Sequence, residues 1–147
     1  MKHHLKKMLF VFLIFGGIQQ LWAQQSKKQA VLEMLSQYEV ALSSKSAVKV
    51  ADIFHDDARI MPEGKPMVIG REAIIANFKG LETIDFKEDF ELKEYIKAGE
   101  YIIIQTKNVG HWGNPTTKES GEFEVNGMMV LKPDENGKLK IYRYAYN

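Results

Sequence analysis

The most constraining feature of this sequence is a long stretch of alternating side chains in its second half. Between Thr83 and Lys97, one face of an extended chain collects every second residue: Ile84, Phe86, Glu88, Phe90, Leu92, Glu94 and Ile96. A period of two is the pattern of a half-buried β-strand. Three further strand-like segments follow at residues 101–109, 119–132 and 138–146, joined by turn-forming sequences such as Pro133–Gly137. The second half therefore predicts an antiparallel meander of four strands.

The first half has the apolar spacing of helices. Residues 28–43 place apolar side chains three and four apart, residues 47–54 form a shorter second segment, and residues 70–81 form a third. Two short strands, at residues 58–61 and 65–69, flank a Pro-Glu-Gly turn between the second and third helices. This order predicts an α+β fold with helices on one face of a curved antiparallel sheet.

The N-terminus has the layout of a secretory signal. Residues 1–7 are basic, residues 8–18 are an apolar run of 11 residues, and the segment that follows ends in the small residue Ala23. A membrane helix needs about 20 apolar residues, so this run predicts no stable anchor. We expect residues 1–23 to be a signal peptide and residues 24–147 to form a single domain, exported to the periplasm or the medium.

Composition narrows the function further. Three of the 20 basic residues fall in the predicted signal, which leaves 17 against 19 acidic residues in the mature chain. A net charge of −2 argues against nucleic-acid binding through a basic surface. The chain has no cysteine, so disulfides and thiolate metal sites are excluded. We expect no metal and no cofactor, although His55-Asp56-Asp57 places a histidine beside two carboxylates that could also serve only to support a turn.

Four segments together resemble a known superfamily. They are residues 38–42 (YEVAL), 51–62 (ADIFHDDARIMP), 70–74 (GREAI) and 137–143 (GKLKIYR). In order and spacing this sequence looks like the nuclear transport factor 2-like superfamily, in particular its SnoaL-like and ketosteroid-isomerase-like branch. The resemblance implies a cone of curved sheet wrapped around three helices, with a pocket at the open end. It also implies a homodimer, formed by the outer face of the sheet, where Leu139 and Ile141 would share one side of the last strand.

The same resemblance implies which residues would act in the pocket. Tyr38, 18 residues before Asp56, matches the tyrosine that holds the oxyanion in the family's isomerases. The place of the catalytic base is occupied by Met61-Pro62, and the place of the protonated acid by Asn126 or Gly127. Neither can perform the proton transfer, and Glu63 lies in a turn that we expect to be exposed. Ketosteroid isomerisation by the family's mechanism is therefore not expected.

The end of the chain supplies the predicted pocket wall. Strict alternation would place Tyr142, Tyr144 and Tyr146 on one face, which the resemblance aligns with the pocket-lining positions of the family. Trp112 follows a buried-looking strand and could form an aromatic rim, or could only pack there. The predicted ligand-binding residues are Tyr38, Met61, Trp112, Tyr142, Tyr144 and Tyr146.

The sequence leaves three interpretations of the pocket open, two with a bound small molecule and one without. The first is an exported domain that binds a small, mostly apolar ligand in the cone pocket. The second is an isomerase, dehydratase or cyclase that uses Tyr38 with an unidentified acid or base. The third is an accessory domain whose pocket is filled by its own side chains. An open pocket that contains a titratable group favours the enzyme, an open neutral pocket favours binding, and a filled pocket favours the third.

Overall fold

The computed structural model describes residues 25–147, and the chain divides into two compact units, Met1–Val31 and Leu32–Asn147. Of the first unit, residues 25–31 are described and are helical. The predicted signal peptide, residues 1–23, lies outside the described residues. Within residues 25–147, no helix combines the length and the apolar character needed to cross a membrane.

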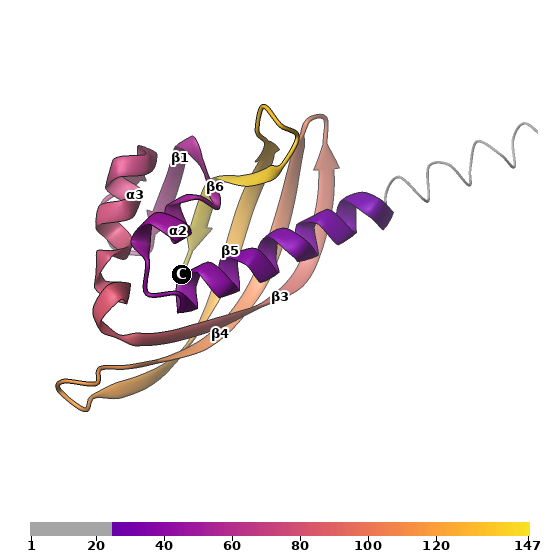
Figure 1. Ribbon diagram of the computed structural model, residues 1–147. Coiled ribbons are helices and arrows are strands. Elements are labelled where there is room, and N and C mark those ends of the chain that lie inside the picture. The colour runs from indigo at the N-terminus through magenta and orange to yellow at the C-terminus, as the bar shows by residue number, and fades with distance from the viewer. Residues whose placement is uncertain (1–24) are drawn as a thin grey trace, which may run out of the picture. The chain divides into compact units, whose positions relative to one another are not determined.

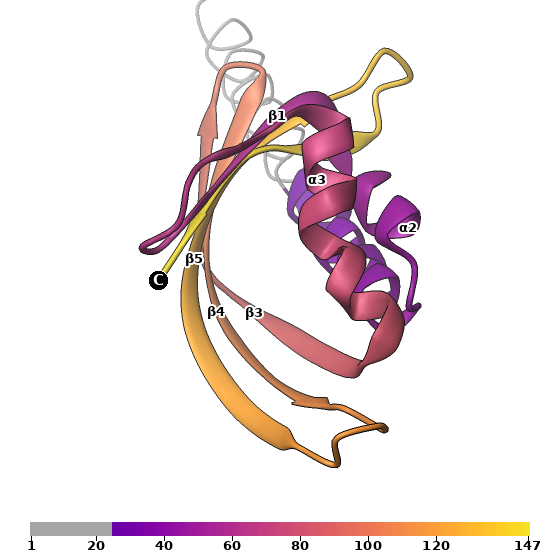
Figure 2. The ribbon, with the colours of Figure 1, turned by 90° about the vertical axis from the view of Figure 1, so that its left-hand side faces the viewer.

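The second unit has the predicted mixture of helices and strands (Figure 1). A helix at residues 32–43 comes first, and the remaining elements follow in this order: α2 (Ala47–Ala51), β1 (Phe54–Pro62), β2 (Val68–Ile69), α3 (Gly70–Phe78), the 3-10 helix η1 (Lys79–Thr83), β3 (Asp85–Ala98), β4 (Tyr101–Gly113), β5 (Ser120–Pro133) and β6 (Leu139–Tyr146). Figure 2 shows α2 and α3 on the concave side of the curved sheet. The α+β prediction is confirmed.

Two element boundaries differ from the prediction. The second helix, α2, ends at Ala51 rather than Phe54, because Phe54 is already paired with β6. Its start is fixed by Ser46, whose side chain accepts a hydrogen bond from the backbone N–H of Lys49. The early end places His55, Asp56 and Asp57 in β1 rather than at a helix end.

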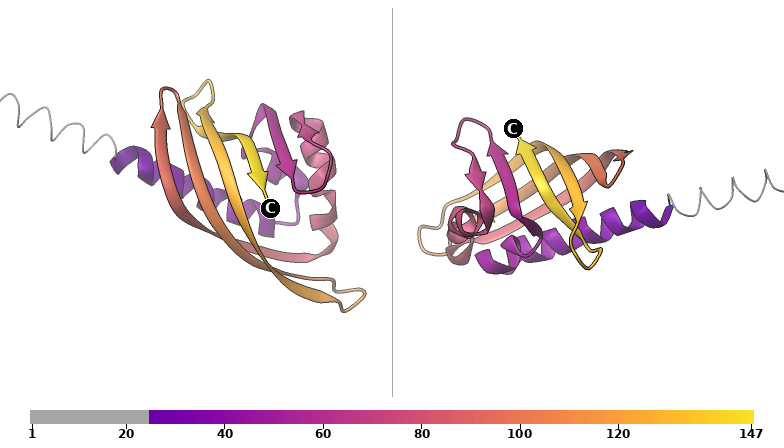
Figure 3. Two further views of the ribbon diagram at one scale, coloured as in Figure 1. Left: turned by 180° about the vertical axis from the view of Figure 1, so that it is seen from behind. Right: turned by 90° about the horizontal axis from the view of Figure 1, so that it is seen from above.

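The six strands are ordered β2-β1-β6-β5-β4-β3. All neighbours are antiparallel except β1 and β6, which are parallel. The prediction of a wholly antiparallel sheet is therefore corrected at one pair. The reason is topological, since the chain leaves β1, builds the β3–β5 meander and returns beside β1 only with its last strand (Figure 3).

Two β-bulges break the alternation that the sequence predicts. In β3, Lys93 is the extra residue between Leu92 and Glu94, so the buried-face position paired with Ile104 belongs to Tyr95. Ile96, predicted to share the face of Phe86, is therefore 44% exposed. A bulge inserts one unpaired residue and exchanges the two faces beyond it.

The second bulge lies in β6 and corrects two predictions. Tyr142 is the extra residue between Ile141, which pairs with Leu131, and Arg143, which pairs with Val130. Ile141 is fully buried, so it cannot supply an outward apolar face for a dimer. Because Tyr142 is this extra residue, the prediction that it shares a face with Tyr144 and Tyr146 is wrong.

Candidate functional site

A cavity of about 720 Å³ lies between the helices and the inner face of the sheet. This volume falls in the range of pockets that hold small molecules. Its wall comes from the helix at residues 32–43, the turn after β1, α3, η1 and four strands, and consists of Tyr38, Leu42, Lys65, Asn77, Phe78, Gly80, Leu81, Thr83, Ile84, Phe86, Glu88, Trp112, Phe123, Val125, Tyr144 and Tyr146. Most of these side chains are apolar or aromatic.

The sheet wall of the cavity is built by aromatic rings that lie on glycines. A Cβ on Gly110 would stand 2.4 Å from Cζ of Phe123, and a Cβ on Gly121 would stand 2.8 Å from Nε1 of Trp112. Gly110 pairs with Phe123, and Gly121 pairs with Trp112, across β4 and β5. Each ring therefore covers the glycine opposite it. Without the glycines the rings would be pushed away from the sheet and into the cavity.

Two polar residues of the wall, Glu88 and Tyr144, are joined by hydrogen bonds from Asn108, which does not itself line the cavity. Asn108 on β4 is fully buried, and its Nδ2 donates to Oε1 of Glu88 on β3 and to the hydroxyl oxygen of Tyr144 on β6, at 2.9 Å each. Because the Tyr144 oxygen accepts this bond, its own O–H remains able to donate to a bound molecule. A Cβ on Gly127 would stand 2.9 Å from the Tyr144 ring, so this glycine gives the ring its place.

The surroundings of Glu88 raise the pKa of its carboxyl group. Burial is the main cause, and the charge of Glu39 adds to it, while the hydrogen bond from Asn108 works in the opposite direction. Together they raise the pKa of Glu88 from 4.5 to about 7. A carboxyl group with this pKa accepts or donates a proton near neutral pH.

The two tyrosines beside Glu88 stay neutral. Burial raises the pKa of Tyr38 well above 10, and nearby Tyr144 and Glu88 raise it further. Burial and Glu88 likewise raise the pKa of Tyr144. Tyr38 is held by its ring contacts, with centroids 5.5 Å from Phe54, 5.1 Å from Phe90 and 6.4 Å from Tyr144. Both phenols are therefore hydrogen-bonding groups rather than bases.

Four of the six predicted ligand-binding residues line the cavity, namely Tyr38, Trp112, Tyr144 and Tyr146. Met61 does not, because β1 turns Ile60 into the core and leaves Met61 38% exposed. Tyr142 does not either, since the bulge removes it from the face of Tyr144. Its ring instead packs 5.9 Å from that of Tyr101, with the Arg143 guanidinium 3.5 Å from its centre.

The other residues considered for an acid, a base or a metal ligand do not line the cavity. Asn126 is exposed, whereas its neighbour Gly127 is buried beneath Tyr144. Glu63 is exposed, as predicted. His55 contacts Asp57, with 2.6 Å between Nδ1 and Oδ1, on a half-exposed part of β1. Within residues 25–147 there is no group of side chains arranged to hold a metal ion.

Sequence reasoning missed Glu88 and Asn108 as members of the site. The signal was present, since the alternation already placed Glu88 on the same face as Phe86 and Phe90. An acid between two phenylalanines on a face that is to be buried is an exception that calls for a functional explanation. Asn108 follows the same rule on β4, two residues beyond Thr106 on the buried face.

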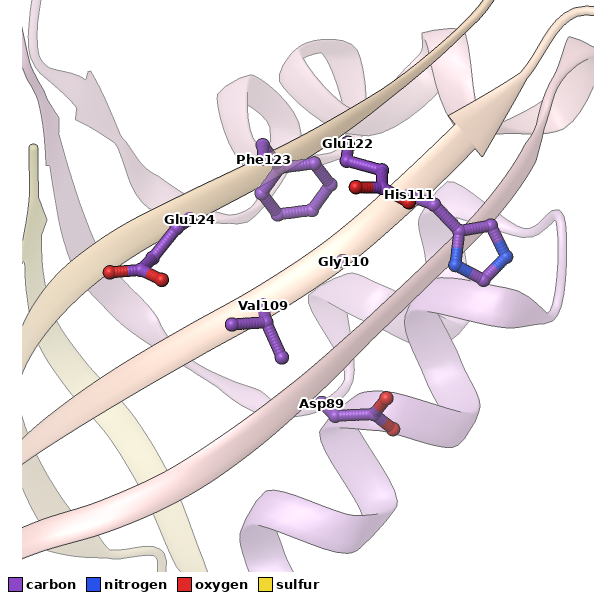
Figure 4. A pocket seen from close by; sticks show the side chains of 7 residues that line it. All are labelled: Asp89, Val109, Gly110, His111, Glu122, Phe123 and Glu124. Atoms are coloured by element: carbon purple, nitrogen blue, oxygen red, sulfur yellow. The ribbon is translucent and has the colours of Figure 1, made fainter.

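A second hollow, of about 490 Å³, lies on the other face of β3, β4 and β5 (Figure 4). Its side chains include His111 and three carboxylates, Asp89, Glu122 and Glu124. Alternation along β4 separates the adjacent residues His111 and Trp112, with Trp112 in the cavity wall and His111 in the outer hollow.

Comparison with known proteins identifies the fold. No family model and no curated protein matches this sequence. Among solved structures, a ketosteroid isomerase-like protein from Erwinia carotovora atroseptica has a TM-score of 0.70 at 18% identity, covering 80% of this chain and 92% of the other. ActVI-ORFA from Streptomyces coelicolor has a TM-score of 0.72 at 15% identity, covering 83% and 96%. An NTF2-like protein from Novosphingobium aromaticivorans has a TM-score of 0.72 at 12% identity, covering 88% and 86%. The chain therefore has the nuclear transport factor 2-like fold, in agreement with the resemblance of its sequence.

Proposed function

We propose that the cavity binds a small, flat, mostly apolar molecule that carries one hydrogen-bonding group. The single observation that supports this most is an open volume of about 720 Å³ whose wall combines aromatic rings with Glu88 and Tyr144, which Asn108 joins by hydrogen bonds. Buried polar side chains that face a cavity select the molecule that can pair with them. An open cavity also argues against a pocket filled by its own side chains.

The wall indicates how such a molecule would lie. Its plane would stack on Trp112, which lies against Gly121, whereas Phe123 is already stacked on Phe86 with ring centroids 5.4 Å apart. Its polar group would meet the Tyr144 hydroxyl, which can donate, and the second carboxyl oxygen of Glu88, which can donate or accept. A carbonyl or a hydroxyl group matches this pair.

A second candidate, an enzyme of the isomerase type, is favoured by Glu88. Near neutral pH its carboxylate can take a proton from a carbon next to a carbonyl group. The electron pair of the broken C–H bond then forms the C=C bond of an enolate, whose oxygen receives a hydrogen bond from Tyr144. In a β,γ-unsaturated ketone the enolate is conjugated with the second C=C bond, so return of the same proton to the γ-carbon gives the conjugated isomer without any oxidant or reductant. Glu88 would be the acid or base that the sequence did not identify.

Native mass spectrometry of the protein from its own host tests binding, because it would show a retained small molecule directly. The enzymatic candidate is tested with 2-tetralone, a flat apolar ketone, by following the exchange of its α-hydrogens for deuterium by NMR. We expect exchange above the buffer rate that Glu88→Gln abolishes and Glu94→Gln, on an exposed part of β3, retains. Binding of tetralone without added exchange would leave only the binding function.

Export of the chain and its assembly as a homodimer stay predictions. N-terminal sequencing that begins at Gln24 would support export, and an intact Met1 on a cytoplasmic protein would contradict it. Sedimentation at micromolar concentration tests the dimer.

A further inference from the structure

The rim of the cavity carries a lysine that the proposed binding mode does not yet use. Lys65 lies in the turn after β1, where its backbone N–H donates to the carbonyl of Pro62 at 3.4 Å. The next hydrogen bond holds this turn to the end of the sheet, since the N–H of Glu63 donates to the carbonyl of Tyr146 at 3.1 Å. The turn that carries Lys65 is thereby held to the end of β6, whose Tyr146 is another residue of the cavity wall.

The charges of the wall make this position distinctive. Among the described residues that line the cavity, Lys65 is the one cation and Glu88 the one carboxylate. Within residues 25–147, no carboxylate lies within ion-pair distance of Lys65, whereas Lys45, Lys79 and Lys107 each have such a partner. Glu63 is close along the chain but does not line the cavity. The lysine is exposed, and Glu88 is buried.

We propose that Lys65 is a specificity-determining residue that selects ligands bearing a carboxylate or similar anion in addition to their hydrogen-bonding group. The cavity would thus take a flat amphipathic acid, with its carbonyl or hydroxyl group at Glu88 and Tyr144 and its anion at the rim. An anion at the rim stays partly hydrated, so the ion pair forms without the full cost of burying a charge. This inference rests on the proposed binding function and adds the charge of the ligand to it.

Two probes of the same shape test the inference on the purified full chain. They are 6-hydroxy-2-naphthoate and its neutral amide, 6-hydroxy-2-naphthamide, titrated by naphthol fluorescence at about pH 6, where Glu88 is mostly protonated. We expect the naphthoate to bind about fivefold more tightly than the amide, the size of a partly exposed ion pair. The preference should fall as salt is added.

The variant Lys65→Gln should remove the preference and leave the affinity for the amide unchanged. Lys97→Gln, which changes an exposed lysine outside the cavity, is the matched control and should keep the preference. Equal binding of both probes by the unchanged chain, or an unchanged preference in Lys65→Gln, would overturn this inference while leaving the cavity function in place. Binding of neither probe would overturn the cavity function and this inference with it.

Discussion

The inner face of β4 and β5 consists of two regions that differ in packing. At one end, Ile102 and Ile104 on β4 oppose Leu131 and Met129 on β5, and all four are at most 4% exposed. At the other end the same face carries Thr106, Asn108, Gly110 and Trp112 opposite Gly127, Val125, Phe123 and Gly121. Aliphatic side chains fill the space beneath the helices, whereas glycines under flat rings leave space. A single pair of strands therefore builds both the core and the cavity.

The largest expected difference between the two regions is in their tolerance of truncation. Ile104→Ala should lower the free energy of unfolding by about 3–4 kcal/mol, because it leaves a void in a closed core. Val125→Ala should cost less than about 1 kcal/mol, since the removed methyl groups already face the open cavity. Urea unfolding of both variants checks this. Equal losses would mean that the cavity end is packed as tightly as the core.

The cavity region contains a buried carboxyl group, Glu88, which should make the free energy of unfolding depend on pH. Its pKa of about 7 in the folded chain exceeds the ordinary 4.5, so between these values the folded state holds a proton that the unfolded state has released. The free energy of unfolding should therefore fall as pH rises through this interval, by up to about 3 kcal/mol from this group. Glu88→Gln should lose this dependence, and urea unfolding at about pH 5 and about pH 8 measures it. Glu94→Gln is the control, and the same slope in both variants would show that Glu88 is not responsible.

The glycines at the cavity end should be more sensitive than glycines at its border. A Cβ on Gly110 would stand 2.4 Å from the backbone oxygen of Lys87 as well as from the Phe123 ring, so Gly110→Ala should cost about 1–3 kcal/mol. A Cβ on Gly113 would meet nothing within 4 Å, so Gly113→Ala should be close to neutral. Thermal unfolding of both variants decides the matter. A neutral Gly110→Ala would show that Phe123 does not rest on the sheet.

Much of this architecture is predictable from the sequence. Alternation over residues 83–97 and the turns after it predict the meander, and the spacing of apolar residues predicts the helices. Both bulges escape such reasoning, because a period of two carries no sign of one inserted residue such as Lys93 or Tyr142. Alternation alone therefore places Tyr142 in the pocket, whereas the bulge in β6 removes it.

The site was predictable in its parts and not in its assembly. Alternation places Glu88, Asn108 and Tyr144 on the inner face, but their contacts depend on the register of β3, β4 and β6. Registry between strands is set by pairing over a distance, and local sequence does not determine it. The family pattern aligns the catalytic base and acid with Met61 and Asn126, but both are exposed, and the buried acid of the site is Glu88.

The smallest predicted effect concerns the hydrogen bond to the ligand. Tyr144→Phe should weaken the binding of 6-hydroxy-2-naphthamide by about 1 kcal/mol, because one neutral hydrogen bond is lost. Tyr101→Phe, on a tyrosine outside the cavity, should bind as the unchanged chain does. Fluorescence titration resolves this difference of about fivefold. An unchanged affinity in Tyr144→Phe would remove its hydroxyl from the binding site.

The location of the bound probe on the two regions tests the cavity as the binding site. Titration of 6-hydroxy-2-naphthamide into the ¹⁵N-labelled full chain is followed by NMR. We expect shifts of the Trp112 indole N–H and of the amides of Gly121 and Gly127, while the amides of Ile104 and Met129 stay in place. Shifts confined to His111 and Glu122 in the outer hollow, or no shifts at saturating probe, would contradict the cavity as the binding site.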